Sequence, residues 1–151
     1  MAQFKISGLA QLQKEIAAIA ELNGGEIIKT MLKEGSKEVK AKWEEETQVR
    51  HVYTGEMLDN IKTSRVKKNK YGSFTVTYPM GSEHRIRKGK DVTVRNAEKA
   101  FYQHYGYFNV LTGKFHRGDR WVEIVDIKAE PAAERVMQNI WDKYLQEKQK
   151  N

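Results

Sequence analysis

Residues 61–78 read IKTSRVKKNKYGSFTVTY, and this stretch decides the fold. Its first eight residues have the composition of a strand, residues 69–72 have that of a turn, and the remainder alternates apolar with polar side chains. Such alternation places every second side chain on the same face of a strand. The stretch therefore predicts an antiparallel hairpin that buries Phe74, Val76 and Tyr78 on one face.

The chain before this hairpin has the spacing of helices. After a short strand-like segment at residues 4–6, apolar residues recur every three or four positions in two sets, which places each set on one helical face. Residues 23–25 (Asn-Gly-Gly) separate the two sets, because glycine favours helix ends. Gly35, within the second set, costs a helix about 1 kcal/mol relative to alanine and so indicates close packing or a kink. The two sets are Leu9, Leu12, Ile16, Ile19 and Leu22, then Ile28, Leu32, Val39 and Trp43.

The chain after the hairpin mixes irregular and periodic segments. Residues 84–91 and 106–119 are irregular and contain glycine, so we expect two flexible loops. A helix is expected over residues 97–105, and a strand over residues 121–127, where apolar residues dominate. Pro131 suits the first turn of a last helix.

This order of elements predicts the fold class. Helices, strands, a helix, a strand and a helix follow one another, and the last helix ends in a polar tail, residues 146–151, that we expect to fray. We predict a single α+β domain over residues 1–151. In it, a long N-terminal helical region and a C-terminal helix pack on a small, mainly antiparallel sheet.

Positive charge is concentrated in the middle of the chain. The sequence has 27 Lys and Arg against 20 Asp and Glu, a net charge of +7. Ten basic and only two acidic side chains lie between Lys62 and Arg95, so this segment carries the whole excess. Concentrated charge of one sign attracts partners of the opposite sign. Four candidate partner-binding residues lie in this segment, Arg85, Arg87, Lys88 and Lys90, and two more, Lys114 and Arg117, lie in the segment at residues 106–119.

The same basic segment has two other interpretations. It is also typical of solvated strands with a mobile loop. Alternatively, it belongs to a small basic nucleic-acid-binding domain, in which Tyr71, Phe74 and Tyr78 stack on bases beside the lysines.

Residue patterns that carry chemistry are missing from the sequence. The chain has no cysteine, which excludes a disulfide framework and a thiolate metal site. Its four histidines do not occur in pairs four residues apart, the spacing that places two metal ligands on one helix face. We therefore expect no enzymatic activity, no metal and no cofactor. We also expect no membrane partner, because no apolar run approaches the roughly 18 residues of a membrane-spanning helix and the start of the chain lacks a signal pattern.

Four short motifs follow one another along almost the whole chain. They are FKISGLAQL at residues 4–12, YTGEMLDNI at residues 53–61, AFYQHYG at residues 100–106 and AEPA at residues 129–132. Their order resembles the tail-completion, or head–tail joining, proteins of long-tailed bacteriophages. Those proteins typically open with Phe-x-Ile-x-Gly-Leu-x-x-Leu and continue with Thr-Gly-x-Leu-x-x-Ser-Ile-like, Tyr-Ala-x-x-Val-Glu-x-Gly-like and Pro-Phe-x-x-Pro-Ala-like segments.

The chain departs from the family pattern at three places. Tyr53 precedes the Thr-Gly pair where the family often has proline. Tyr105, next to His104, stands where the family has glutamate. The basic segment at residues 84–91 is an elaboration of the pattern.

The resemblance implies a non-enzymatic structural component of the virion. Copies of the chain would form a ring, expected to be six-fold, at the neck or the top of the tail. The ring would touch neighbouring connector, terminator or tail-tube proteins through residues 84–91 and 106–119, with non-specific DNA contact as a further option. The protein would be made in the cytoplasm of a bacterial host and would then reside in the virion.

Overall fold

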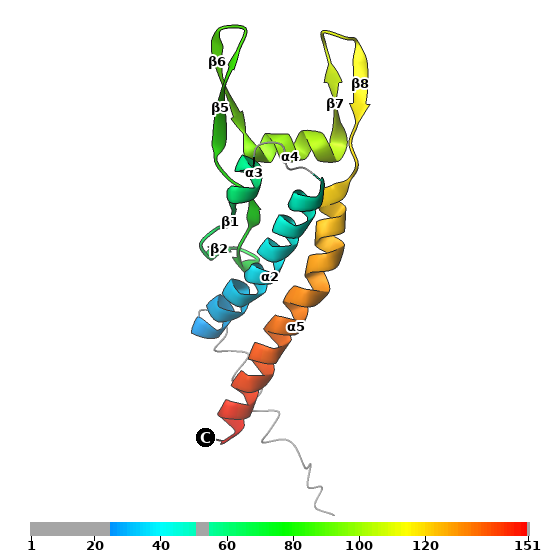
Figure 1. Ribbon diagram of the computed structural model, residues 1–151. Coiled ribbons are helices and arrows are strands. Elements are labelled where there is room, and N and C mark those ends of the chain that lie inside the picture. Colours follow the sequence, from blue (N-terminus) through cyan, green and yellow to red (C-terminus); the bar gives the residue numbers. More distant parts are fainter. Residues whose placement is uncertain (1–24, 51–54, 151) are drawn as a thin grey trace, which may run out of the picture.

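The computed structural model describes residues 25–50 and 55–150, and its body is built around two long helices that run side by side (Figure 1). These helices are α2 (Glu26–Arg50) and α5 (Trp121–Lys150). Small helices and short strands connect them. In chain order these are α3 (Glu56–Asp59), β1 (Ile61–Thr63), β2 (Lys67–Asn69), β3 (Gly72–Phe74), β4 (Thr77–Pro79), β5 (Ser82–Arg87), β6 (Lys90–Arg95), α4 (Asn96–Tyr105), β7 (Gly106–Asn109) and β8 (Lys114–Arg117). The α+β class expected from the sequence is confirmed.

The core lies where α2, α4, α5 and the first strands meet. Trp43 of α2 and Trp121 of α5 are both buried, and their rings meet edge to face with centroids 5.1 Å apart. This arrangement brings the positive edge of one ring against the negative face of the other. Met57, Ile61, Ala100 of α4 and Val125 complete the same buried cluster. The core therefore holds together the end of the body from which α4 and its flanking strands extend.

Close packing of α2 against α5 explains Gly35. A Cβ atom at this position would lie 3.0 Å from Cγ and 3.2 Å from Sδ of Met137 on α5. Glycine thus allows α2 to approach a bulky side chain of α5. Of the two explanations that the sequence left open at this position, close packing is the one that the contacts support.

The predicted hairpin at residues 61–78 is confirmed as antiparallel, but it consists of two short ladders. Strand β1 pairs with β4, and β2 pairs with β3. Ser64 bridges the gap between them, since its N–H donates to the carbonyl of Val76 and its Oγ accepts from the N–H of Val76. The predicted burial was wrong, because Val76 and Tyr78 are exposed and Phe74 is half-buried. In the part of the chain that the structure describes, the strands form four separate two-stranded sheets rather than one.

The C-terminal third corrects three predictions. Residues 121–127 were expected to form a strand, but they are the first two turns of α5. Pro131, expected in the first turn of the last helix, lies inside α5 instead. The helix continues through it because the face formed by Trp121, Val125, Ala129 and Ala133 stays buried on both sides. Residues 146–150, expected to fray, continue α5 as regular helix.

The acidic run at Glu44, Glu45 and Glu46, which has the pattern of an exposed helix face, is not uniformly exposed. The Glu46 side chain is only 4% exposed and bonds to Lys128 of α5 and, at 3.1 Å, to Arg50. These hydrogen bonds, that to Lys128 foremost, lower the pKa of Glu46. The ion pair between Glu46 and Lys128 thus joins α2 to α5, in addition to the apolar packing between these helices.

Two predicted features lie outside the described residues. These are the strand at residues 4–6 and the helix over residues 9–22.

Candidate interaction surface

Two β-hairpins project from the same end of the molecule. Figure 1 shows the β5–β6 hairpin rising from one end of α4 and the β7–β8 hairpin rising from the other, both on the side away from α2 and α5. These hairpins occupy the two segments, residues 84–91 and 106–119, that the sequence analysis expected to be flexible loops. That expectation was wrong, since both segments form paired antiparallel strands.

Turn chemistry explains the β5–β6 hairpin. Its strands pair in continuous register from Ser82 opposite Arg95 to Arg87 opposite Lys90. Lys88 and Gly89 form the two-residue turn, and their φ angles are 50° and 74°. Two positive φ angles define the turn whose twist matches the twist of paired strands. Glycine meets this requirement easily, and the lysine is one of only two non-glycine residues with positive φ in the described part of the chain.

Charge pairing anchors the base of this hairpin to α4. Glu83 contacts Arg85 of its own strand at 2.7 Å and also bonds to Lys99 of α4. Hydrogen bonds from Arg85 and then from Lys99 lower the pKa of Glu83 to about 2. The Asn96 side chain, fully buried, donates from Nδ2 to the carbonyl of Met80 at 2.8 Å. Two residues of α4, Lys99 and Asn96, therefore hold the base of the β5–β6 hairpin.

The tip of the β5–β6 hairpin carries three cations directed to solvent. Arg87, Lys88 and Lys90 are exposed, and within the described residues none of the three forms an ion pair with a neighbouring carboxylate. Arg85 differs from them because Glu83 already engages its guanidinium group. Of the four candidate residues in this hairpin, three are thus available to a partner and one is a structural anchor.

The β7–β8 hairpin has an apolar tip. Asn109 pairs with Lys114, and the loop between them begins with Val110 and Leu111, whose side chains are 84% and 85% exposed. The Asn109 side chain accepts hydrogen bonds from the N–H groups of Leu111 and Thr112, at 3.0 and 3.3 Å. Asparagine commonly shapes a turn in this way. The exposed apolar pair is therefore displayed by an ordered turn.

Both faces of the β7–β8 hairpin are aromatic. Phe108 lies opposite Phe115 on one face. On the other face the rings of Tyr107 and His116 stack with centroids 4.9 Å apart and planes inclined by 14°. The candidate residues Lys114 and Arg117 are exposed among these rings, Lys114 on the face of Tyr107 and Arg117 on that of Phe108.

The aromatic surface continues from the hairpin onto α4. Tyr102 of α4 contacts Tyr107, with ring centroids 6.2 Å apart, and Phe101 contacts both Tyr102 and Tyr105. All four of these rings are exposed. We call Phe101, Tyr102, Tyr105, Tyr107 and His116 the aromatic ridge. It runs from the C-terminal half of α4 to the β7–β8 strands.

The base of the β7–β8 hairpin is fixed by backbone packing. A Cβ atom at Gly106, where φ is 93°, would lie 2.3 Å from the carbonyl oxygen of His116. The buried His104 accepts a hydrogen bond at Nδ1 from the N–H of Val122 and at its carbonyl from the N–H of Arg120. The end of α4, the hairpin and the start of α5 are thus joined at one point.

The structure brings the six predicted residues to one end of the molecule but on two separate hairpins. Arg85, Arg87, Lys88 and Lys90 belong to one, and Lys114 and Arg117 to the other. The charge argument missed the apolar members of this surface, which are Ile86, Val110, Leu111, Phe108 and Phe115. The signal that could have found them is the pair of strand-flanked glycines, Gly89 and Gly113, each with positive φ.

Two other kinds of site are absent from residues 25–50 and 55–150. No group of three or more His, Asp or Glu side chains there is arranged to hold a metal ion. No helix in the same residues has the length and apolar character to span a membrane. In comparisons with known proteins, no family model, no curated protein and no solved structure matches the chain.

Proposed function

We propose that the chain is a structural assembly protein of a bacteriophage virion, a tail-completion or head–tail joining subunit that forms a ring at the neck or the top of the tail. The observation that carries the proposal is the pair of hairpins at one end of the body, with Val110 and Leu111 exposed at one tip. The motif order at residues 4–12, 53–61, 100–106 and 129–132 supports the same conclusion.

Exposed apolar side chains on an ordered turn favour binding to a protein. Single apolar residues on a surface are common, but a contiguous exposed set marks an interaction site. Here the tip residues Val110 and Leu111 adjoin Phe108 and Phe115 of the same hairpin. Aromatic and apolar anchors of this kind supply most of the binding energy in protein interfaces. Neighbouring connector, terminator or tail-tube subunits are the partners that we propose for them.

The cations of the other hairpin suit acidic surfaces on those partners. Lys88 lies in one exposed turn, and Arg87 and Lys90 flank it. Charges of this kind speed encounter and select orientation more than they raise affinity. In this account the β7–β8 tip anchors the neighbour, and the β5–β6 tip orients it. The role is non-enzymatic and places the protein in the virion after synthesis in the host cytoplasm.

Copies of the chain also contact one another in this proposal. The two hairpins lie at one end of an elongated body. In a ring whose copies all point their hairpins in the same direction, each contact joins two different surfaces of adjacent copies. Heterologous contacts of this type close into rings when the rotation between copies permits. We expect six copies, as the resemblance implies.

A second candidate function is binding to nucleic acid, which one specific observation favours. Lys114 and Arg117 lie among the exposed rings of Tyr107, His116 and Phe108. Rings beside cations can stack on bases while the cations contact phosphate. This alternative predicts an affinity for DNA that falls steeply with salt and depends on both cations.

Native mass spectrometry of the full chain, alone and with purified connector or tail-tube protein, tests the main proposal. We expect a ring or a partner complex that the double variant Val110→Asp, Leu111→Asp loses. The matched control is Ile127→Asp, because Ile127 is also strongly exposed (71%) but lies on α5. A chain that stays monomeric and binds neither partner overturns the proposal. Salt-sensitive DNA binding lost in Lys114→Ala, Arg117→Ala would favour the alternative.

A further inference from the structure

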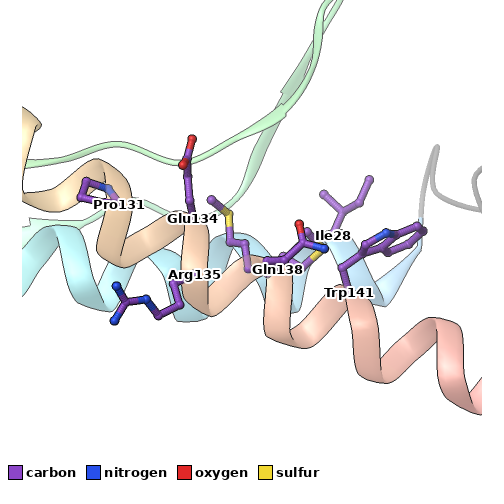
Figure 2. Close-up of a pocket in the computed structure, with 8 residues that line it drawn as sticks. Ile28, Pro131, Glu134, Arg135, Gln138 and Trp141 are labelled. Atoms are coloured by element: carbon purple, nitrogen blue, oxygen red, sulfur yellow. The ribbon is translucent and has the colours of Figure 1, made fainter.

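A wide apolar groove lies between the halves of α2 and α5 that are distant from the hairpins. Its volume is about 750 Å³. Figure 2 shows Ile28 of α2 and Trp141 of α5 at one end of the groove and Pro131 of α5 at the other. Every described residue that lines it comes from these two helices, and the full set is Ile28, Met31, Pro131, Glu134, Arg135, Met137, Gln138 and Trp141.

The groove is too large to be a packing defect. Protein interiors leave few voids larger than a water molecule, whereas this space would hold many side chains. Met31, Met137 and Trp141 are only partly buried although they stand between two core helices. A helix pair with an apolar flank of this size normally buries it against another element.

The chain itself contains a segment of matching character. Residues 9–22 carry five apolar side chains on one helical face, and Lys14 and Glu21 fall on the opposite face. Only residues 23–25, Asn-Gly-Gly, separate this segment from the start of α2. A loop this short between two helical segments makes them antiparallel neighbours.

We propose that residues 9–22 of the same chain are the occupant of the α2–α5 groove. Fourteen residues of helix span roughly 21 Å, and the part of α5 from Pro131 to Trp141 spans roughly 15 Å at the same rise per residue. The segment is thus long enough to cover the whole lining. Residues 23–25 connect the last residue of the segment, Leu22, to Glu26, the first residue of α2. Glu26 precedes Ile28 by two residues, so the connection lies at the end of the groove where Ile28 and Trp141 lie.

This proposal rests on the groove and the sequence pattern and is independent of the proposed function. It has one consequence for that function. With the groove filled from within the chain, the hairpins and the aromatic ridge remain exposed to external partners.

Engineered cysteines test the proposal cleanly because the chain has no cysteine of its own. Gln138→Cys, on the groove, is paired in the full chain with Ile16→Cys, Ile19→Cys or Leu22→Cys on the apolar face of the segment. The matched control pairs Gln138→Cys with Glu21→Cys on the polar face. A disulfide forms only where the two Cα atoms come within about 7 Å. We expect at least one apolar-face pair to cross-link within the monomer at tenfold or greater yield than the control.

Three results would overturn the proposal. These are no cross-link in any pair, equal yields on both faces, and cross-links only between two chains, which would make a second copy the occupant. A second measurement covers variants that fold poorly. In NMR spectra of the methionine methyl groups, Ile19→Ala should shift the Met31 and Met137 signals, whereas Glu21→Ala should leave them in place. Unchanged Met31 and Met137 signals in Ile19→Ala would also overturn the proposal.

Discussion

Replacing Gly118 with alanine should destabilise the junction that holds the β7–β8 hairpin. A Cβ atom at Gly118 would lie 2.2 Å from the carbonyl oxygen of His104, 2.4 Å from its carbonyl carbon and 2.5 Å from the nitrogen of Gly106. All three contacts are to backbone, so no side-chain rotation can relieve them. Forcing an extra methyl group into close-packed surroundings costs on the order of 1–3 kcal/mol, and we expect the upper part of this range, about 2–3 kcal/mol.

Urea unfolding and thermal melting measure this loss directly. For a chain of this length, 2–3 kcal/mol corresponds to a fall in Tm of roughly 4–12 °C. Gly113→Ala is the matched control, because its Cβ would meet nothing within 4 Å and only the positive φ of 65° opposes it. That conformational cost is about 1–2 kcal/mol. If Gly118→Ala were within 0.5 kcal/mol of the wild type, the close backbone contact at the hairpin base would be refuted.

Two further predictions concern the α2–α5 pair. Glu46→Gln should lower the free energy of unfolding by about 2 kcal/mol at neutral pH, because it removes a charged hydrogen bond to Lys128. The pKa of Glu46 is lowered, so this contribution is complete well above pH 4.5 and is lost as the pH falls through the folded-state pKa. In acid, the urea midpoint of Glu46→Gln should therefore depend less on pH than that of the wild type. Gly35→Ala should change stability by less than about 1 kcal/mol, since the helix propensity that alanine adds offsets a shift of the flexible Met137 side chain. A larger loss by urea titration would contradict this balance.

Periodic apolar segments were predictable from the sequence. The helix through Ile28 and Trp43 follows from spacing alone, since apolar residues three or four apart must share a face and that face packs on α5. The helix at α4 and the antiparallel pairing of residues 61–78 followed for the same kind of reason. In the two helices, local pattern and tertiary burial select the same structure. In the hairpin, alternation predicts the pairing correctly although Val76 and Tyr78 of the alternating face stay exposed.

The start of α5 was mispredicted because its local signals conflict. The segment WVEIVDI at residues 121–127 is rich in β-branched residues, which favours a strand. On the helix, however, Trp121 and Val125 lie four residues apart on the buried face, in line with Ala129. Tertiary burial of that face prevails over local propensity, and it carries the helix through Pro131 although proline lacks an N–H donor.

The candidate surface was predictable in charge but not in shape. Arg87, Lys88 and Lys90 were found because net charge can be counted along a sequence. The hairpin that presents them was not, because its turn is Lys88-Gly89 rather than the Asn-Gly or Asp-Gly pair that usually signals such turns. The apolar tip at Val110 and Leu111 escaped for a related reason, since its strands are only four residues long and exposed on both faces.

Hydrogen exchange of the full chain, free and in its assembled ring or partner complex, tests the central claim most directly. The claim is that the two hairpins form the contact surface. We predict slower exchange on assembly at the tips, residues 87–90 and 109–114, with little change over the buried length of α2 and α5. Assembly that leaves both tips as unprotected as in the free chain, while protecting another surface, would contradict the account.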